Sequence, residues 1–309
     1  MRLIFCGTPQ FAVPPLEKLL AHNFDVALAV TNPDEPQGRG YALKPPPVKV
    51  ASLKAGLKIL QPAKLKEARS EIESVKPDVI VVVAYGHLIP PWMIDLPPLG
   101  CINLHASLLP LYRGAAPIAR AIIRGERLTG ITTMKIDAGL DTGDILLQKE
   151  IAIDEDDTAE TLSARLSEPG AELVVETLEG LARGEIQPRP QDHGMATLAP
   201  MLKKEDGLID WSMPAPEIAC RVRGLAPWPV AHTLFRGKGL QIWVARPEES
   251  QASSPAPGAI RIGGGRLIVG CGACTALELV ELQVEGRKRI HARDFINGMR
   301  PQDGERLGK

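Results

Sequence analysis

Asn103 and His105 stand two residues apart at the end of the short apolar segment Cys101–His105. Because side chains alternate between the two faces of a strand, both would project from the same face. An imidazole that exchanges a proton near neutral pH, beside an amide that can donate a hydrogen bond, suits acid/base chemistry at a carbonyl group. A histidine that simply bonds a backbone group near a strand end explains the same residues equally well. The spacing alone leaves both interpretations open.

A candidate third group lies in the segment Gly139-Leu-Asp-Thr-Gly-Asp144, where glycines predict a tight turn with Asp141 at its tip. A carboxylate that reaches the ring would orient the imidazole and favour its protonated form. An ordinary turn aspartate is the simpler interpretation, and turn chemistry alone favours it. Asp137, Asp141 and Asp144 do not have the spacing of an EF-hand calcium loop, so no metal site is predicted here.

The elements that would position these residues follow an alternation of short apolar runs and helix-like segments through the first half of the chain. This alternation predicts an α/β fold with a doubly wound, mostly parallel, Rossmann-like sheet whose ligand lies at the carboxyl ends of the strands. The predicted strands are Arg2–Cys6, Val26–Thr31, Asp78–Tyr85 and Cys101–His105. The predicted helices are Phe11–Ala21, Val48–Ala55, Ala63–Val75 and Ala115–Arg124.

The pattern changes after this sheet. Thr129–Asp137 and Ile145–Ile153 predict an antiparallel pair at an edge, and Thr158–Ala182 predicts a long helix that Pro169-Gly170 should interrupt or kink. A Pro-rich stretch then predicts a linker. Beyond it, short β-type runs separated by Gly and Pro predict a small OB-like β-barrel, with strands at His232–Phe235, Gln241–Ala245, Ala259–Ile262, Arg266–Gly270 and Ala276–Val284. We therefore predict a catalytic domain over 1–188, a linker over 189–207 and a barrel over 208–309.

Composition supports two domains, because 309 residues with 44% hydrophobic content exceed one typical domain. Lys plus Arg number 36 against 37 Asp plus Glu, yet residues 209–309 hold 14 basic and 10 acidic residues, so the C-terminal third is the basic part.

Five cysteines, an odd number, and a start (MRLIFCGTP) without a charged leader or long apolar run predict a cytoplasmic protein. Cys271-Gly-Ala-Cys274 lacks a second ligand pair at zinc spacing, so neither metal nor redox function is assigned to it. Nothing demands a dimer, and a monomer is the default expectation.

The segment CINLHASLLPLYRGAAPI, followed by GLDTGD, resembles the signature of the folate-dependent formyltransferases, in which an Asn, a His and an Asp share one site. The rest of the chain is similar to the members of that family that act on methionyl-initiator tRNA, through FCGTPQFAVPPL, NPDEPQGRG, VVVAYGHLIP, LKKEDGLIDW and RVRGLAPWPV in the same order. Two departures are Ala106, where the family often has Gly, and Glu35-Pro36-Gln37, where relatives are often more basic.

The resemblance implies transfer of a formyl group from 10-formyltetrahydrofolate to the α-amino group of methionine on its initiator tRNA. It makes Asn103, His105 and Asp141 the catalytic residues, with neither metal nor redox cofactor required. Folate would be bound by two segments, through Ser107, Leu108, Leu109 and Pro110 and through Val83, Tyr85, Gly86 and Ile89.

The tRNA contacts that the resemblance and the basic residues suggest are Arg39, Lys203, Lys204, Arg287, Lys288 and Arg289, with His291 and Arg293 beside the last three. Each charge alone is explained more simply as solvated surface, and their joint placement favours RNA. Two rivals stay open. One is a formyltransferase or hydrolase of the same family that acts on a small amine or water, and the other is a non-catalytic RNA-binding protein.

Overall fold

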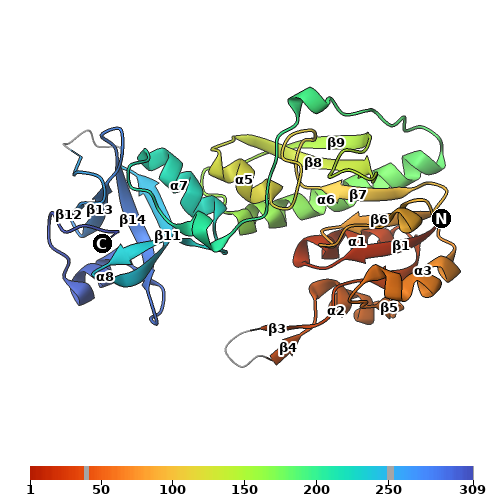
Figure 1. Ribbon diagram of the computed structural model, residues 1–309, viewed down its shortest axis with the longest axis horizontal. Coiled ribbons are helices and arrows are strands. Elements are labelled where there is room, and N and C mark those ends of the chain that lie inside the picture. Colours follow the sequence, from red (N-terminus) through yellow and green to blue (C-terminus); the bar gives the residue numbers. More distant parts are fainter. Residues whose placement is uncertain (38–41, 249–253, 309) are drawn as a thin grey trace. The chain divides into compact units, whose positions relative to one another are not determined.

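The computed structural model of the protein describes residues 1–37, 42–248 and 254–308 (Figure 1). These residues form two compact units. One comprises 1–117, 128–152 and 163–200, and the other contains 118–127, 153–162 and the residues from 201 onward. No helix in the described part of the chain has the length and hydropathy that a membrane span requires.

A seven-stranded sheet runs through the first unit in the order β5-β2-β1-β6-β7-β8-β9. Neighbours from β5 to β7 pair in parallel, whereas β8 and β9 are added antiparallel. The predicted doubly wound sheet with an antiparallel edge pair is thereby confirmed. The strands are β1 Arg2–Gly7, β2 Asp25–Val30, β5 Ile59–Leu60, β6 Val79–Val83, β7 Cys101–His105, β8 Leu128–Lys135 and β9 Ile145–Ala152. Strand β5 was not predicted, because two residues are too few to show a strand pattern.

Helices cover both faces of this sheet because its central strands are apolar on both sides. On one face, Ile4 and Ile80 share a core cluster with Ile72 of α3 (Arg69–Val75). On the other, α1 (Val13–Ala21) and α6 (Ala159–Ala182) are linked by an ion pair of 3.4 Å between Lys18 and Glu168. Asn103 and His105 occupy alternate positions of β7 with Cys101, a member of the α3 cluster, and so project from the face opposite α6.

The helices differ from prediction mainly at their starts. Short 3₁₀ turns at Gln10–Ala12 and Leu65–Ala68 precede α1 and α3, while α2 (Pro47–Lys54) and α5 (Pro117–Ile123) lie within two residues of their predicted ranges. The predicted interruption of α6 is wrong, since the helix is continuous through Pro169. Gly170 packs so closely on β7 that a Cβ there would lie 2.8 Å from Cδ2 of Leu104. The helix thus continues although Pro169 removes one backbone donor, and Gly170 lets it approach the strand closely. Short elements that were not predicted are β3 Glu35–Gln37, β4 Ala42–Lys44 and α4 Pro91–Ile94.

The second unit contains an antiparallel sheet in the order β10-β11-β14-β13-β12, with β15 on β14. The C-terminal segment joins the two edges of this sheet. The N–H of Leu307 donates to the carbonyl of Gly258 beside β12, and the N–H of Gly308 donates to that of Leu234 in β10, both at 2.9 Å. The strands are β10 Ala231–Phe235, β11 Lys238–Pro247, β12 Ile260–Gly263, β13 Arg266–Gly270, β14 Ala276–Val284 and β15 Ile290–His291. Their arrangement agrees with the predicted small barrel.

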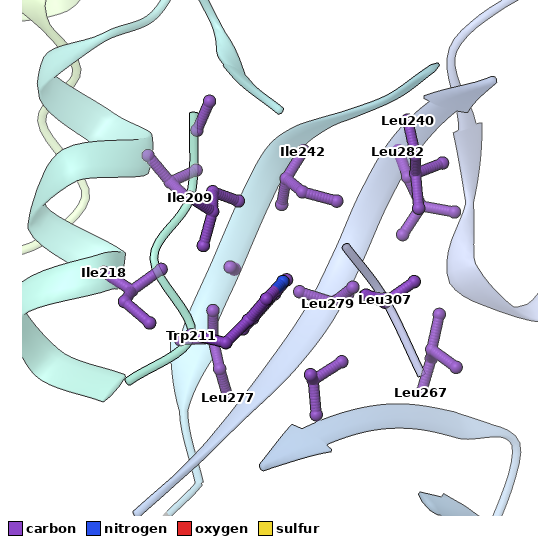
Figure 2. Close-up of a cluster of buried hydrophobic side chains, with 14 of the residues drawn as sticks. Ile209, Trp211, Ile218, Leu240, Ile242, Leu267, Leu277, Leu279, Leu282 and Leu307 are labelled. Atoms are coloured by element: carbon purple, nitrogen blue, oxygen red, sulfur yellow. The ribbon is translucent and has the colours of Figure 1, made fainter. Parts of the chain in front are cut away.

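Two helices of this unit, α7 (Ala215–Gly224) and α8 (Ala292–Met299), were not predicted. Figure 2 shows the core that they help to close, in which Ile218 of α7 and Trp211 face leucines of the central strands. Leu307 of the C-terminal segment lies in the same cluster. The indole N–H of Trp211 donates to the hydroxyl of Thr233 at 3.2 Å, so its one polar atom is satisfied within the core.

Candidate active site

His105 is the last residue of β7, and its side chain is only 6% exposed. Its Nε2 lies 2.9 Å from the carbonyl oxygen of Tyr112. Because a carbonyl can only accept, Nε2 carries a hydrogen and donates it. Nδ1 is then the nitrogen that can take up or release a proton, and it lies 3.7 Å from Oδ2 of Asp141. The structure therefore brings together the predicted histidine and aspartate, with Tyr112 fixing the tautomer.

Asp141 is held in the loop between β8 and β9 by close backbone packing. A Cβ on Gly143 would lie 1.9 Å from the carbonyl oxygen of Lys135, so only glycine fits there. Asp137 accepts bonds from the N–H of Gly139 (3.0 Å) and the hydroxyl of Thr142 (2.7 Å), which closes the turn. Asp141 itself has a left-handed φ of 52°, a conformation that costs a residue with a Cβ roughly 1–2 kcal/mol. Its Oδ2 accepts the N–H of Gly114 at 2.8 Å, which aims the carboxylate at His105.

Asn103 lies in the middle of the sheet, paired with Val82 of β6 on one side and Met134 of β8 on the other. Two residues along a strand place its Cα about 6.6 Å from that of His105, on the same face. The side chain is partly exposed. Among the described residues, no protein group is recorded as a hydrogen-bond partner of its amide. The amide is therefore available to a ligand at the carboxyl end of β7.

Thr132 and Gln148 shape the turn after His105 and were missed by sequence reasoning. The Thr132 hydroxyl, fully buried opposite His105 in the β7–β8 pairing, donates to the carbonyl of Ser107 at 2.6 Å and accepts the N–H of Leu109 at 3.2 Å. Gln148 donates to that hydroxyl at 3.0 Å and to the Leu109 carbonyl at 2.9 Å. The sequence signal was a pair of adjacent threonines, Thr132 and Thr133, within the strand LTGITTMK.

The turn Ser107–Pro110 uses some of its own side chains for structure. The hydroxyl of Ser107 is buried and donates to the carbonyl of Leu111 at 2.6 Å. Leu109 is 3% exposed and clusters with Met134 and Ile145. Leu108 and Pro110 are partly exposed. Any ligand contact by this turn therefore falls to these two side chains and to the backbone.

The loop from Val83 to Ile89 follows β6 at the same edge of the sheet as His105. Ala84 and Gly86 have φ angles of 46° and 89°, which turn the chain sharply after β6. Tyr85 is 2% exposed, and burial raises the pKa of its hydroxyl. Its carbonyl accepts the Thr8 hydroxyl at 3.1 Å. Val83 is buried, Ile89 is partly exposed, and Gly86 to Leu88 are exposed. The loop can thus offer backbone donors and acceptors to a planar ligand.

Two family models match the chain. The model of the formyl transferase family matches residues 1–178, and the model of the formyl transferase C-terminal domain matches residues 201–300. The methionyl-tRNA formyltransferase of Koribacter versatilis is 57% identical over 312 residues, covering 100% of this chain and 99% of that protein. This chain belongs to the formyl transferase family, among its methionyl-tRNA formyltransferases.

Solved structures share the fold of this formyl transferase. The methionyl-tRNA formyltransferase from Clostridium thermocellum has a TM-score of 0.60 at 18% identity and covers 92% of this chain and 98% of its own. HypX from Aquifex aeolicus, in complex with tetrahydrofolic acid, has a TM-score of 0.67 at 18% identity over 96% of this chain. The formyl transferase spans about half of HypX, 47% of that chain.

The basic residues that were predicted to contact tRNA, as far as they are described, lie on the surface of the second unit. Lys203 and Lys204 are exposed, as are Arg287, Lys288 and Arg289. Arg289 pairs with Glu281 and lies over the ring of Trp243 at 4.9 Å, so part of its charge is already used. Lys204 and the turn at Glu285-Gly286 line one groove with the exposed ring of Trp228. Of the predicted basic residues, Lys204 lines this groove, and Arg287 directly follows its last lining residue, Gly286. Arg39 lies outside the described residues.

Two other features of the sequence acquire a structural account. Cys271 and Cys274 are free thiols, and burial raises the pKa of the Cys271 thiol to about 12, which makes it a poor nucleophile and metal ligand. In the described ranges, His, Cys, Asp and Glu side chains form no group of three or more that could hold a metal ion. The carboxylate of Asp137 is engaged within its own turn.

Proposed function

We propose that this formyl transferase moves the formyl group of 10-formyltetrahydrofolate to the α-amino group of methionyl-initiator tRNA, with Asn103, His105 and Asp141 as its catalytic residues. The observation that carries the proposal is the full-length 57% identity to a methionyl-tRNA formyltransferase. The distance of 3.7 Å between Nδ1 of His105 and Oδ2 of Asp141, at the end of a central strand, supports the assignment of the residues.

The reaction forms a bond between the amine nitrogen and the formyl carbon and breaks the bond between that carbon and N10 of the folate. Negative charge develops on the formyl oxygen in the tetrahedral intermediate. A donor fixed at that oxygen contributes about 2.7–4 kcal/mol. The amide of Asn103, partly exposed beside His105, is the donor we assign to this oxygen.

Proton transfer falls to Nδ1 of His105, because Nε2 is committed to the carbonyl of Tyr112. An α-amino group has an ordinary pKa of about 7.7–8.0, so its ammonium form must first lose a proton to solvent, because only the neutral amine can attack. Nδ1 then accepts the proton that the attacking nitrogen sheds as its bond to the formyl carbon forms, and returns it to N10 as the folate leaves. Asp141 faces Nδ1 and stabilises the imidazolium while it holds the proton.

Folate recognition is assigned to the two loops at the carboxyl ends of β6 and β7. The tetrahydrofolic acid in the complex of HypX supports a folate donor for this family member. We assign the pterin to the exposed backbone of Gly86 to Leu88, and its apolar contacts to Leu108, Pro110 and Ile89. Ser107, Leu109, Val83 and Tyr85 are buried and support these loops from beneath.

The acceptor tRNA is assigned to the basic surface of the second unit and to Arg39. Exposed Lys203, Lys204, Arg287 and Lys288 suit phosphate contacts, since no carboxylate partner is recorded for them within the described residues. We place the reaction in the cytoplasm, where charged tRNA is used, and assign the activity to a monomer.

The test is direct formylation by the purified protein. With 10-formyltetrahydrofolate, methionyl-initiator tRNA should be converted to N-formylmethionyl-tRNA, whereas methionyl-elongator tRNA and free small amines should react far more slowly. A variant with His105→Ala serves as the blank. No formylated initiator tRNA above that blank contradicts the proposal. Rapid formylation of a small amine in place of the tRNA would reassign the acceptor.

A further inference from the structure

Behind Asp141 lies a pair of buried polar side chains that the mechanism above does not use. Arg113 and Gln191 are each 6% exposed. The amide nitrogen of Gln191 donates to the carbonyl oxygen of Asp141 at 2.9 Å and to that of Gly143 at 2.7 Å. Both carbonyls belong to the turn that points Asp141 at His105. One amide group therefore ties two backbone positions of the catalytic loop.

The orientation of this amide is fixed by Arg113. Its Nε and Nη2 donate to Oε1 of Gln191 at 3.1 and 2.7 Å. A guanidinium can only donate, so the oxygen of Gln191 must face Arg113 and the NH₂ group must face the loop. Nη2 also lies 3.1 Å from Nδ1 of His193, which accepts for the same reason. The buried charge is thus surrounded by acceptors, and the amide cannot flip without losing bonds to both sides.

Residues 112 to 114 connect this pair to the catalytic side chains. The carbonyl of Tyr112 fixes the ring of His105, the side chain of Arg113 binds Gln191, and the N–H of Gly114 binds the carboxylate of Asp141. The same three residues are fastened to the segment that carries Gln191. The N–H of Arg113 donates to the carbonyl of Thr197 at 2.8 Å, and the carbonyl of Arg113 accepts the N–H of Ala199 at 2.7 Å.

We propose that Gln191, oriented by Arg113, is a positioning residue that holds Asp141 in its left-handed backbone conformation and so keeps the carboxylate opposite Nδ1 of His105. The inference rests on the proposed function for its catalytic meaning. A residue with a Cβ disfavours a φ of 52°, so the loop relaxes unless its carbonyls are tied. Relaxation turns the Asp141 side chain away from the ring while leaving the substrate sites intact.

Two variants separate this role from general stability. Gln191→Ala removes the amide group that clamps the carbonyls of Asp141 and Gly143. Gln191→Glu keeps an oxygen for Arg113 but replaces the donor to the two carbonyls with a second oxygen. Both should lower kcat for formyl transfer by about 10- to 100-fold, with KM for folate and tRNA changed less than about threefold, because a misplaced catalytic group costs rate rather than binding. Thr177→Val is the matched control. It removes buried hydrogen bonds to Thr133 and Leu173 in the same unit and should lower the Tm with kcat unchanged.

A double-mutant cycle tests the route of action. If Gln191 works through Asp141, Gln191→Ala should cost almost nothing further in an Asp141→Asn background. Full additivity would overturn the inference.

A crystal structure of Gln191→Ala gives a readout that needs no activity. Movement of Asp141 out of φ near 52° and away from His105 supports the clamp, and an unchanged loop overturns it. A wild-type protein without formyl transfer would refute the proposed function, while the crystal structure would still decide the positioning role.

Discussion

Nε2 of His105 donates to the carbonyl oxygen of Tyr112 at 2.9 Å, which leaves Nδ1, 3.7 Å from Asp141, as the nitrogen available for proton transfer. The ring is therefore oriented by the backbone of a neighbouring turn. The carboxylate lies slightly beyond hydrogen-bond distance. A proton on Nδ1 would attract the carboxylate of Asp141. The distance between the two groups should therefore shorten when the ring takes up a proton during catalysis.

Replacing His105 with glutamine separates these two roles of the ring. The amide of a glutamine at this position could still donate to Tyr112, so the Tm should change little, but it cannot take up a proton. We expect His105→Gln to lower kcat by about 10²- to 10⁴-fold. Steady-state kinetics and thermal unfolding measure both effects. A variant that keeps more than a tenth of wild-type kcat would remove His105 from the mechanism.

Replacing Asp141 with asparagine tests the charge. The new side chain keeps an oxygen for the N–H of Gly114 but loses the negative charge facing His105. Two unit charges about 4 Å apart interact by about 4 kcal/mol at an effective dielectric constant of 20, so kcat should fall by up to about 10³-fold. Asp137→Asn is the control, because it neutralises a carboxylate of the same loop whose hydrogen bonds, within the described part of the chain, go to Gly139 and Thr142. Equal losses in the two variants would point to loop folding in place of charge.

Replacing Asn103 with alanine removes the assigned oxyanion donor. We expect kcat to fall about 10²- to 10³-fold with unchanged KM, since the bond strengthens as charge develops. Asn103→Asp should be at least as damaging, because it offers an acceptor and a charge where a donor is needed. Single-turnover measurement of formyl transfer distinguishes the chemical step from product release. An Asn103→Asp enzyme faster than Asn103→Ala would contradict the assignment.

Much of the architecture was predictable because it depends on periodicity. The apolar run of β6 is continuous, and that of β1 is continuous after Arg2, as expected for strands covered on both faces. The alternation of two residues placed Asn103 and His105 on one face. The turn at Asp141 was predictable from its glycines, and the close approach of Gly143 to Lys135 shows why they are needed.

The remaining features depend on contacts that no local pattern encodes. Helix α6 continues through Pro169, and its Gly170 packs closely against Leu104, which is distant in sequence. The Pro-rich stretch after residue 188 was predicted to be a linker from composition, yet Gln191 reaches the backbone of Asp141 across 50 positions. The tautomer of His105 depends on a main-chain carbonyl, and a backbone group leaves no signature in residue type.

Acid should weaken the closure of the barrel at Glu305. Hydrogen bonds from Arg236, at 2.6 and 2.9 Å, hold the pKa of the Glu305 carboxyl below its ordinary value. A folded pKa below the unfolded value of about 4.3 contributes stability above that pH, which is lost as the pH falls through the folded pKa. Glu305→Gln should therefore lower the free energy of unfolding by about 0.2–1 kcal/mol at pH 7. In urea titrations the difference should shrink as the pH falls below about 4.3 and through the lowered folded pKa. A difference independent of pH would show that shape, not charge, is lost.

Contacts to phosphate should appear in the salt dependence of tRNA binding. Each phosphate neutralised by Lys or Arg adds about 0.7–0.9 to the magnitude of the slope of log K against log salt. Changing Lys203, Lys204, Arg287 and Lys288 together to alanine should therefore reduce that magnitude by about 3 and raise KM for tRNA, with KM for folate unchanged. Lys58→Ala with Lys66→Ala is the control, since both are exposed on the first unit. Filter binding between 50 and 200 mM salt would measure the slopes, because the affinity for tRNA changes strongly over this range when phosphates are contacted. If the fourfold variant keeps the wild-type slope, the phosphates are held elsewhere, and Arg39 with its neighbouring residues becomes the next set to change.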